Sequence, residues 1–164
     1  MASAGSPLNV QYGFEVGDSS VVSVGGSSVG FIEEGISIRV PREYSFLRSD
    51  QYAVPIDSTL LTKDVFVSFT MSEVLGDNLA SAWDNGAYAS STVSVDSNSA
   101  GQVALVVTTK GEDACTRTIT MSKAVSVGDG EWSLPFANKQ TISAEFQGVG
   151  DTANSGRILS VVDS

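Results

Sequence analysis

Histidine is absent from this 164-residue chain, and cysteine occurs once, as Cys115. Without histidine the chain cannot form a Ser-His-Asp triad, a Cys-His dyad or a His-ligated metal site. A single cysteine excludes an intrachain disulfide and any CxxC metal or redox site. We therefore expect no catalytic centre, no metal and no cofactor, and the sequence predicts a protein that is not an enzyme.

Positive charge and long apolar runs are also scarce. The chain has 9 Lys and Arg against 19 Asp and Glu, a formal net charge of −10, so no basic surface for nucleic acid or anionic lipid is expected. The longest apolar run, residues 103–107, is too short to span a membrane. The first residues lack the basic and apolar regions of a signal peptide, so synthesis in the cytoplasm is expected.

The residues that are present favour β-structure. Only 17% of the chain is charged, 41% is hydrophobic and 16 residues are glycine, a composition typical of strands joined by frequent turns. We expect a mainly all-β fold: an antiparallel β-sandwich or half-barrel with one flanking α-helix at about 72–84 and a long loop at about 41–60. Residues 1–10 are expected to form an N-terminal arm, and residues 11–164 a single domain.

Alternation of apolar and polar residues places the strands. Strands with one apolar and one polar face are predicted at 31–40, 62–71, 115–123 and 139–147, and further strands near 21–24, 88–95, 102–110 and 157–162. Residues 102–107 are apolar on both faces, which predicts burial on both. From Ser72 the period changes to helical spacing, with apolar residues at Leu75, Leu79, Ala82 and Trp83.

The segment 41–60 breaks the alternation and is punctuated by Pro41 and Pro55. A connection of this length inside a compact domain is unusual. It still carries apolar side chains, which need a surface to cover them: Tyr44, Phe46, Leu47, Tyr52, Val54 and Ile56. Two interpretations remain open from the residues alone, a flap folded over its own core or an arm that packs on another subunit.

Several short motifs lose their chemical meaning in context. Residues 26–30 match the G-x-S-x-G of a nucleophile elbow, but no histidine can act as base. Residues 96–101 begin like a calcium loop and lack its later ligands. The acidic neighbours Glu33-Glu34, Glu112-Asp113 and Asp129…Glu131 are interpreted as solvated charge. Trp83 falls on the apolar stripe of the predicted helix, whereas Trp132 could stack on a sugar.

Two stretches then resemble a known family. The strand-to-helix unit VFVSFTMSEVLGDNLASAWD, residues 65–84, is similar to the corresponding unit of long-tailed bacteriophage tail tube proteins. The C-terminal stretch RTITMSKAVSVGDGEWSLPFANKQTISAEFQGVGDTANSGRILSVVD, residues 117–163, resembles the end of those proteins, including a last short strand that closes on an aspartate. The glycine-rich strand pair and long loop of the first third are also similar. The match covers most of the chain by pattern.

The resemblance implies a structural virion protein of the phage tail, made in the host bacterial cytoplasm. Six subunits would close a homohexameric ring, and rings would stack by helical assembly into a tube around a tape-measure protein. Tail terminator and tail tip proteins would bind its ends, and double-stranded DNA would pass through during ejection without specific binding. The loop 41–60 would bridge rings through the six apolar residues named above.

The resemblance also implies that polar strand faces line the lumen, where an acidic wall repels phosphate. The residues expected there are Ser37, Ser68, Thr70, Thr118, Thr120, Ser143 and Glu145. Arg39 is a departure from an acidic wall. Two alternatives stay open: a capsid decoration or other virion β-domain, which would trimerise on a shell, and a carbohydrate-binding β-sandwich module, which would need an exposed aromatic platform.

Overall fold

The fold is mainly β. The computed structural model describes residues 12–13, 22–52, 54–72, 76–83, 87–89, 92–94, 101–111, 116–135 and 139–164. In chain order its elements are β1 (Tyr12–Gly13), β2 (Val22–Val24), β3 (Ser27–Ser28), β4 (Ile32–Arg39), β5 (Arg42–Leu47), β6 (Asp57–Lys63), β7 (Phe66–Met71), α1 (Gly76–Ala82), β8 (Ala87–Ala89), β9 (Thr92–Ser94), β10 (Val103–Gly111), β11 (Thr116–Ser126), β12 (Trp132–Ser133), β13 (Thr141–Gly148), the 3-10 turn η1 (Thr152–Asn154) and β14 (Ser160–Asp163). The expected N-terminal arm, residues 1–10, lies outside the described residues.

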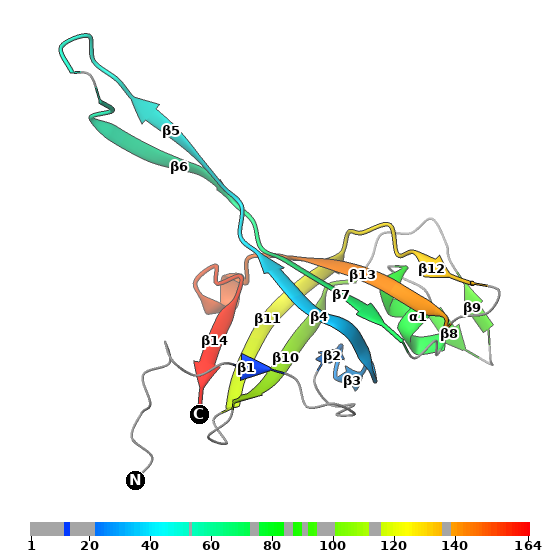
Figure 1. Ribbon diagram of the computed structural model, residues 1–164. Helices are drawn as coiled ribbons and strands as arrows, with labels where there is room; N and C mark the ends of the chain where they lie inside the picture. The colour runs from blue at the N-terminus through cyan, green and yellow to red at the C-terminus, as the bar shows by residue number, and fades with distance from the viewer. Residues whose placement is uncertain are drawn as a thin grey trace.

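One antiparallel sheet of ten strands forms the body. Its strands follow the order β3-β2-β10-β11-β13-β7-β4, and β1, β12 and β14 pair with β10, β13 and β11. The sheet curls, so that β4, β7 and β13 lie across β10 and β11 (Figure 1). The result is the expected antiparallel sandwich or half-barrel.

Strand β11 makes the corner between the two layers. Its residues Ala124–Ser126 pair with β13, whereas Arg117–Thr120 pair with β14 on the same edge. The register between β10 and β11 shifts between Val103 and Leu105, which marks a bulge. A bulge bends and twists a strand locally, so this irregularity lets one sheet serve both layers.

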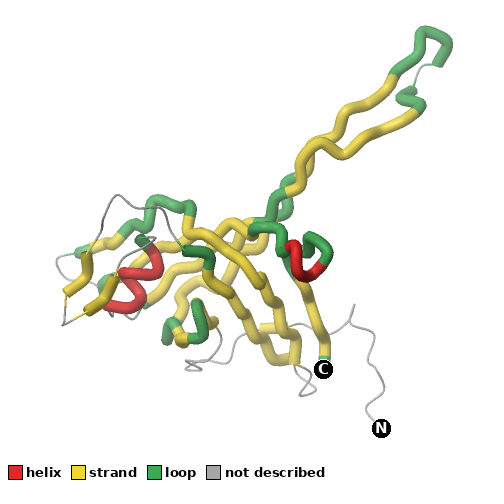
Figure 2. The backbone as a smooth tube through the Cα atoms, turned by 180° about the vertical axis from the view of Figure 1, so that it is seen from behind, coloured by secondary structure: helices red, strands yellow, loops and turns green. Residues whose placement is uncertain are grey.

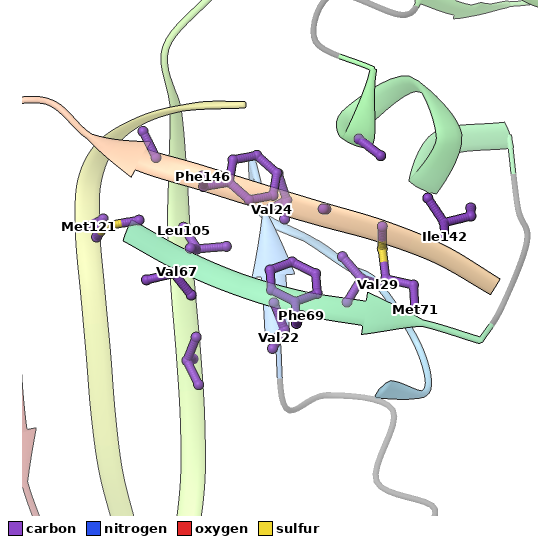
Figure 3. Packing of buried hydrophobic residues seen from close by; sticks show 14 of the residues in the cluster. Val22, Val24, Val29, Val67, Phe69, Met71, Leu105, Met121, Ile142 and Phe146 are labelled. Carbon is purple, nitrogen blue, oxygen red and sulfur yellow. The ribbon is translucent and has the colours of Figure 1, made fainter. Parts of the chain in front are cut away.

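The core fills the space between the layers. In β7 and β13 every second residue is buried, as strand alternation requires. Phe69 and Phe146 stack with ring centroids 5.9 Å apart, and they face the valines of β2 and Leu105 (Figure 3). The largest fully buried side chains are Phe146, Met71, Leu105, Met121, Ile142, Val22, Val29, Val67 and Val107.

The helix covers one end of this core. In the described residues α1 begins at Gly76, later than the expected start at residue 72, and residues 73–75 and 84–86 lie outside the description. Leu79 and Ala82 are buried in the core. The Asn78 amide donates to the Val29 carbonyl over 2.8 Å, and the Ser126 hydroxyl donates to the Ala82 carbonyl over 2.9 Å. These bonds anchor both ends of a short helix.

The segment expected to be a long loop is a β-hairpin. β5 and β6 pair with each other alone and project far from the body (Figures 1 and 2). Pro41 separates β4 from β5, and the strand expected at 62–71 is divided at Asp64 and Val65. The Asp64 N–H donates to the Pro41 carbonyl over 3.1 Å, which joins the two strands at the root of the hairpin.

One strand prediction is wrong in its burial. Residues 102–107 were expected to be buried on both faces, but only Leu105 and Val107 are, whereas Ala104 is exposed and Val106 half-buried. The reason is that Val106 pairs with Ser23 and Thr120, so it belongs to the outer face of its layer. The tight turn between β2 and β3 lies at Gly25 and Gly26, and both glycines take the positive φ that such a hairpin turn requires, +59° and +87°.

Truncation of a core phenylalanine, Phe146, and of a hairpin phenylalanine, Phe46, should affect stability differently. Phe146 is 1% exposed, so Phe146→Ala should lower the free energy of unfolding of the monomer by about 3–5 kcal/mol, measured by urea denaturation. Phe46 is 56% exposed, so the control Phe46→Ala should change it by less than about 0.5 kcal/mol. A large loss for Phe46→Ala would mean that the hairpin packs on its own body.

Candidate interaction surfaces

The hairpin has one apolar face and one polar face. Paired residues project to the same side of a two-stranded ribbon, and successive residues alternate. Tyr44 pairs with Leu60, and Phe46 pairs with Ser58. The Tyr44 and Phe46 ring centroids lie 6.2 Å apart, in agreement with a shared face. We call this the apolar hairpin face, and its residues are Arg42, Tyr44, Phe46, Ser58, Leu60 and Lys63.

The opposite face of the hairpin is mainly polar. It carries Glu43, Ser45, Thr59, Thr62 and Asp57, with Leu47 at its outer end. The register shift between Glu43 and Tyr44 leaves Leu61 as the extra residue of a bulge. The amphipathic pattern of a strand that covers a core is therefore present, but nothing in the described part of the chain lies against the apolar side.

All six apolar residues predicted as contacts in this segment are exposed. Tyr44 is 42% exposed, Phe46 56%, Leu47 59%, Tyr52 60%, Val54 64% and Ile56 50%. The flap interpretation, in which these residues cover their own core, is therefore wrong. Only Tyr44 and Phe46 share the apolar face, Leu47 lies on the other side, and Tyr52, Val54 and Ile56 lie around the tip.

Sequence reasoning missed two apolar residues of the hairpin. Leu60 is 45% exposed and Leu61 56% exposed, both on β6. The sequence DSTLLTK of β6 does not alternate, because two leucines are consecutive. The second of them, Leu61, is the extra residue of the bulge. The signal that could have found this strand is the four-residue polar stretch at 48–51, which is typical of a turn between two paired strands.

The second surface is the outer face of the β4-β7-β13 layer. Ser37, Ser68 and Glu145 form one row across the three strands, and Glu33, Thr70 and Ser143 form the next row. Both rows point away from the core, since Val67, Phe69 and Met71 alternate with them. We call these six residues the polar sheet face. It contains five of the seven residues predicted for a polar lining.

The other two predicted residues lie elsewhere. Thr118 pairs with Thr108 and Val162, and Thr120 pairs with Val106 and Ser160, so both belong to the β10-β11-β14 layer. The two layers pack core side to core side (Figure 3), which turns their outer faces away from each other. The structure therefore does not bring Thr118 and Thr120 to the polar sheet face.

Opposite charges are paired on the polar sheet face. The Arg39 guanidinium lies 3.3 Å from the Glu145 carboxylate and stacks 4.6 Å over the Phe66 ring. Lys139 forms an ion pair with Glu33. Arg39, the basic residue among the polar and acidic residues expected on this face, is thus paired with Glu145 and stacked on Phe66.

A groove of about 650 Å³ runs along this face, walled by residues 127–131. Its lining includes four acidic residues, Glu33, Asp129, Glu131 and Glu145, and no Lys or Arg. The wall is fixed by backbone bonds to β13, from the Val127 N–H to the Glu145 carbonyl and from the Ser143 N–H to the Glu131 carbonyl. Among the described residues, no group of three or more His, Cys, Asp or Glu side chains could hold a metal ion.

The two tryptophans adjoin this wall and pack on the core. Trp83 and Trp132 lie with ring centroids 6.0 Å apart and planes tilted by 55°, and both are half-buried. The Trp83 indole N–H donates to the Gly130 carbonyl. Gly130 takes a φ of +54°, and a side chain there would collide with the Trp83 ring. Trp132 is thus part of a packed pair, not an open platform.

The third surface consists of sheet edges. β4 is the last strand of the sheet order, and no described residue pairs with its outer edge. β3 ends the sheet order on the other side, and β14 carries a second open edge beside β11. Such rows of unpaired N–H and C=O groups are templates for strands of another chain.

Strand β14 is held to β11 by an ion pair and by backbone bonds. The Arg117 guanidinium donates to both carboxylate oxygens of Asp163, over 2.6 and 2.8 Å. Thr116 and Ser164 exchange two backbone hydrogen bonds at the end of the chain. The Arg117 guanidinium holds the pKa of Asp163 below its ordinary value. The pairing thus fixes the last strand in register.

A second carboxylate with a lowered pKa, that of Asp151, holds the turn before β14. Asp151 is 5% exposed and caps η1, where its side chain accepts the Ala153 N–H. The Asn154 amide and the Lys123 ammonium, 3.2 Å away, hold the pKa of Asp151 below its ordinary value. The turn that leads into β14 therefore depends on an ionised aspartate.

Comparison with known proteins adds no relative. No protein-family model matches the chain, and a search of curated proteins finds no match. None of the helices in the described residues is long and apolar enough to cross a membrane. The surfaces above must therefore be interpreted from their own chemistry.

The ion pair of Asp163 predicts a pH dependence. Because its pKa is lowered in the folded protein, Asp163 contributes stability above the pKa of the unfolded chain and loses it as the pH falls through the folded pKa. Asp163→Asn should therefore be less stable than the wild type at neutral pH, and urea unfolding should show the difference vanishing in acid. Asp50→Asn, at the exposed hairpin tip, controls for the loss of one charge. A difference that is independent of pH would contradict this role.

Proposed function

We propose that this protein is the structural subunit of a phage tail tube, which closes into hexameric rings that stack into a hollow conduit. The observation that carries the proposal is the hairpin. An isolated two-stranded hairpin is marginally stable in water, and here no described part of the chain covers its apolar face. A subunit of an assembly has a use for such an arm, since another copy covers it.

Ring closure uses the open edges of the sheet. The outer edge of β4, a strand of eight residues, has no partner among the described residues, and it lies at the other end of the sheet order from β3. An edge that pairs with a different edge of the next copy makes a head-to-tail contact. Such contacts generate closed rings when the rotation between copies closes, and the paired edges are then no longer open to aggregation.

The polar sheet face supplies the wall of the conduit. Five predicted lining residues lie there, and Thr118 and Thr120 are left out of this assignment because they lie on the other layer. Small hydroxyl side chains offer DNA few firm contacts. The described bases of this face, Arg39 and Lys139, are already paired with Glu145 and Glu33, so they offer no unpaired positive charge to the phosphates of DNA.

The partners follow from this role. Before DNA is ejected, a tape-measure protein would fill the conduit, and tail terminator and tail tip proteins would close the two ends of the stack. The location would be the virion, after synthesis in the bacterial cytoplasm. The net charge of −10 agrees with a conduit that DNA passes without being bound.

Removal of the hairpin should separate folding from assembly. Deleting residues 44–54 removes the exposed tip and most of β5, but no residue of the core. We expect a folded monomer, with the circular dichroism and urea midpoint of the wild-type body, that forms no tubes in electron micrographs. Tubes grown from this variant would contradict the role of the hairpin.

A matched pair of substitutions controls for nonspecific effects of the deletion. Tyr44→Asp with Phe46→Asp places two charges on the apolar hairpin face and should block assembly, because burial of unpaired carboxylates is costly. Ser45→Asp with Thr59→Asp places the same two charges on the polar face of the same hairpin, and should leave assembly intact.

Maleimide labelling tests the wall of the conduit. In a Cys115→Ser background, Ser143→Cys should react with a small maleimide in monomers and tubes alike. A maleimide on a polymer too large for the channel should label it in monomers only. Asp77→Cys, exposed on α1 on the core side of the layer, is the control that should react with both reagents in tubes. Labelling of Ser143→Cys in tubes by the large reagent would refute a lumenal polar face.

A further inference from the structure

The apolar hairpin face has a definite chemical character that limits what can cover it. Its apolar part is Tyr44, Phe46 and Leu60, all between 42% and 56% exposed. Its root carries Arg42 and Lys63, which lie opposite each other on the two strands of the hairpin. No acidic residue lies on this face, so a matching surface has exposed apolar side chains and acidic groups.

The body of the same fold offers one continuous stretch of that kind, residues 127–135. Val127 is 44% exposed and Leu134 60% exposed. Asp129 and Glu131 lie between them and are exposed, and the stretch VGDGEWSLP contains no Lys or Arg. We call residues 127–135 the receiving segment. It carries two negative charges, whereas the apolar hairpin face carries two positive charges.

The lengths also agree. The receiving segment lies along β13 from the level of Glu145, which accepts the Val127 N–H, to the level of Thr141, which pairs with Ser133. Four residues of strand span about 14 Å, and the apolar hairpin face from Arg42 to Phe46 covers the same number of residues and so about 14 Å.

A chain cannot make this contact with itself. The hairpin leaves the body at the Gly148 end of β13, where the Gly148 N–H donates to the Val65 carbonyl, and it projects away from the sheet (Figure 1). The receiving segment borders residues 141–145, toward the other end of that strand. A contact between these two surfaces therefore requires two copies of the chain.

The other exposed apolar residues of the body suit the hairpin less well. Val161 and Val162 are successive residues of β14, so they point to opposite faces and offer one side chain each. The acid beside them, Asp163, is already paired with Arg117. Phe31 is exposed, but Glu33, two residues further along the chain, is already paired with Lys139.

We propose that the apolar hairpin face of one copy docks on residues 127–135 of a second copy, with Arg42 and Lys63 opposite Asp129 and Glu131. The inference deepens the proposed function, since it rests on copies of this chain assembling, and it names the surface that receives the hairpin. Aromatic and leucine side chains supply the buried area, and the charge pairs set the register and direction of the contact.

Cross-linking between single-cysteine copies tests the contact. In a Cys115→Ser background, one copy carries Ser58→Cys on the apolar hairpin face, and another carries Ser133→Cys in the receiving segment; both serines are exposed. A short bis-maleimide should give a cross-linked dimer in the mixture. Ser45→Cys, on the polar face of the hairpin, is the matched control and should lose the cross-link with Ser133→Cys.

Other cross-linking patterns would overturn the proposal. A dimer from Ser58→Cys alone would show that hairpins pair symmetrically with each other. Equal yields for Ser58→Cys and Ser45→Cys would show that the face does not matter. Tubes without the Ser58–Ser133 cross-link would leave the tube function standing and refute this docking, whereas cross-linked pairs without a channel would support the docking and refute the tube.

A charge exchange gives a second, independent readout. Arg42→Glu with Lys63→Glu, or Asp129→Lys with Glu131→Lys, should each weaken self-association about tenfold or more in light scattering, since like charges then meet. A mixture of the two variants should associate again, because each supplies the charge that the other now needs. Failure of the mixture to recover, with both variants folded by circular dichroism, would overturn the charge pairing.

Discussion

Strand side chains alternate between the two faces of the sheet, and the core lies on only one of these faces. The rest of the structure depends on this constraint. In β7 and β13 the residues that fill the core fix every intervening residue on the outer face, which carries Ser68 and Ser143. The same alternation continues from β4 into β5. Beyond Pro41, however, no described strand forms a second layer over the hairpin, and its apolar side chains are exposed.

The hairpin and the body therefore have different sources of stability. The body buries a shared cluster that includes Phe69 and Phe146, and the helix is joined to it through Asn78 and Ser126. The hairpin continues from β4 and β7 of the body, and at its root Gln147 of β13 donates to the Asp64 carboxylate. Its apolar side chains Tyr44, Phe46 and Leu60 are exposed, so they add little to the stability of the body.

The sequence predicted which residues of the regular strands β7 and β13 face the core, because alternation is a local signal. The β7 and β13 faces follow from neighbouring residues, whereas the residues alone left open whether the segment 41–60 is a flap or an arm. The hairpin itself was missed because a bulge at Leu61 and the prolines break the pattern. The division of the polar residues between two layers could not be predicted, because it depends on where β11 bends. Pairing such as Thr120 with Val106 is set by tertiary contacts that alternation alone does not encode.

The measurement that tests the central claim most directly is negative-stain electron microscopy of the purified, concentrated and aged protein, with its mass followed by light scattering. The account predicts hollow rings, and stacks of rings with a continuous central channel, formed by this chain alone. A discrete closed trimer without a channel would contradict the tail tube function and favour a protein that decorates a shell.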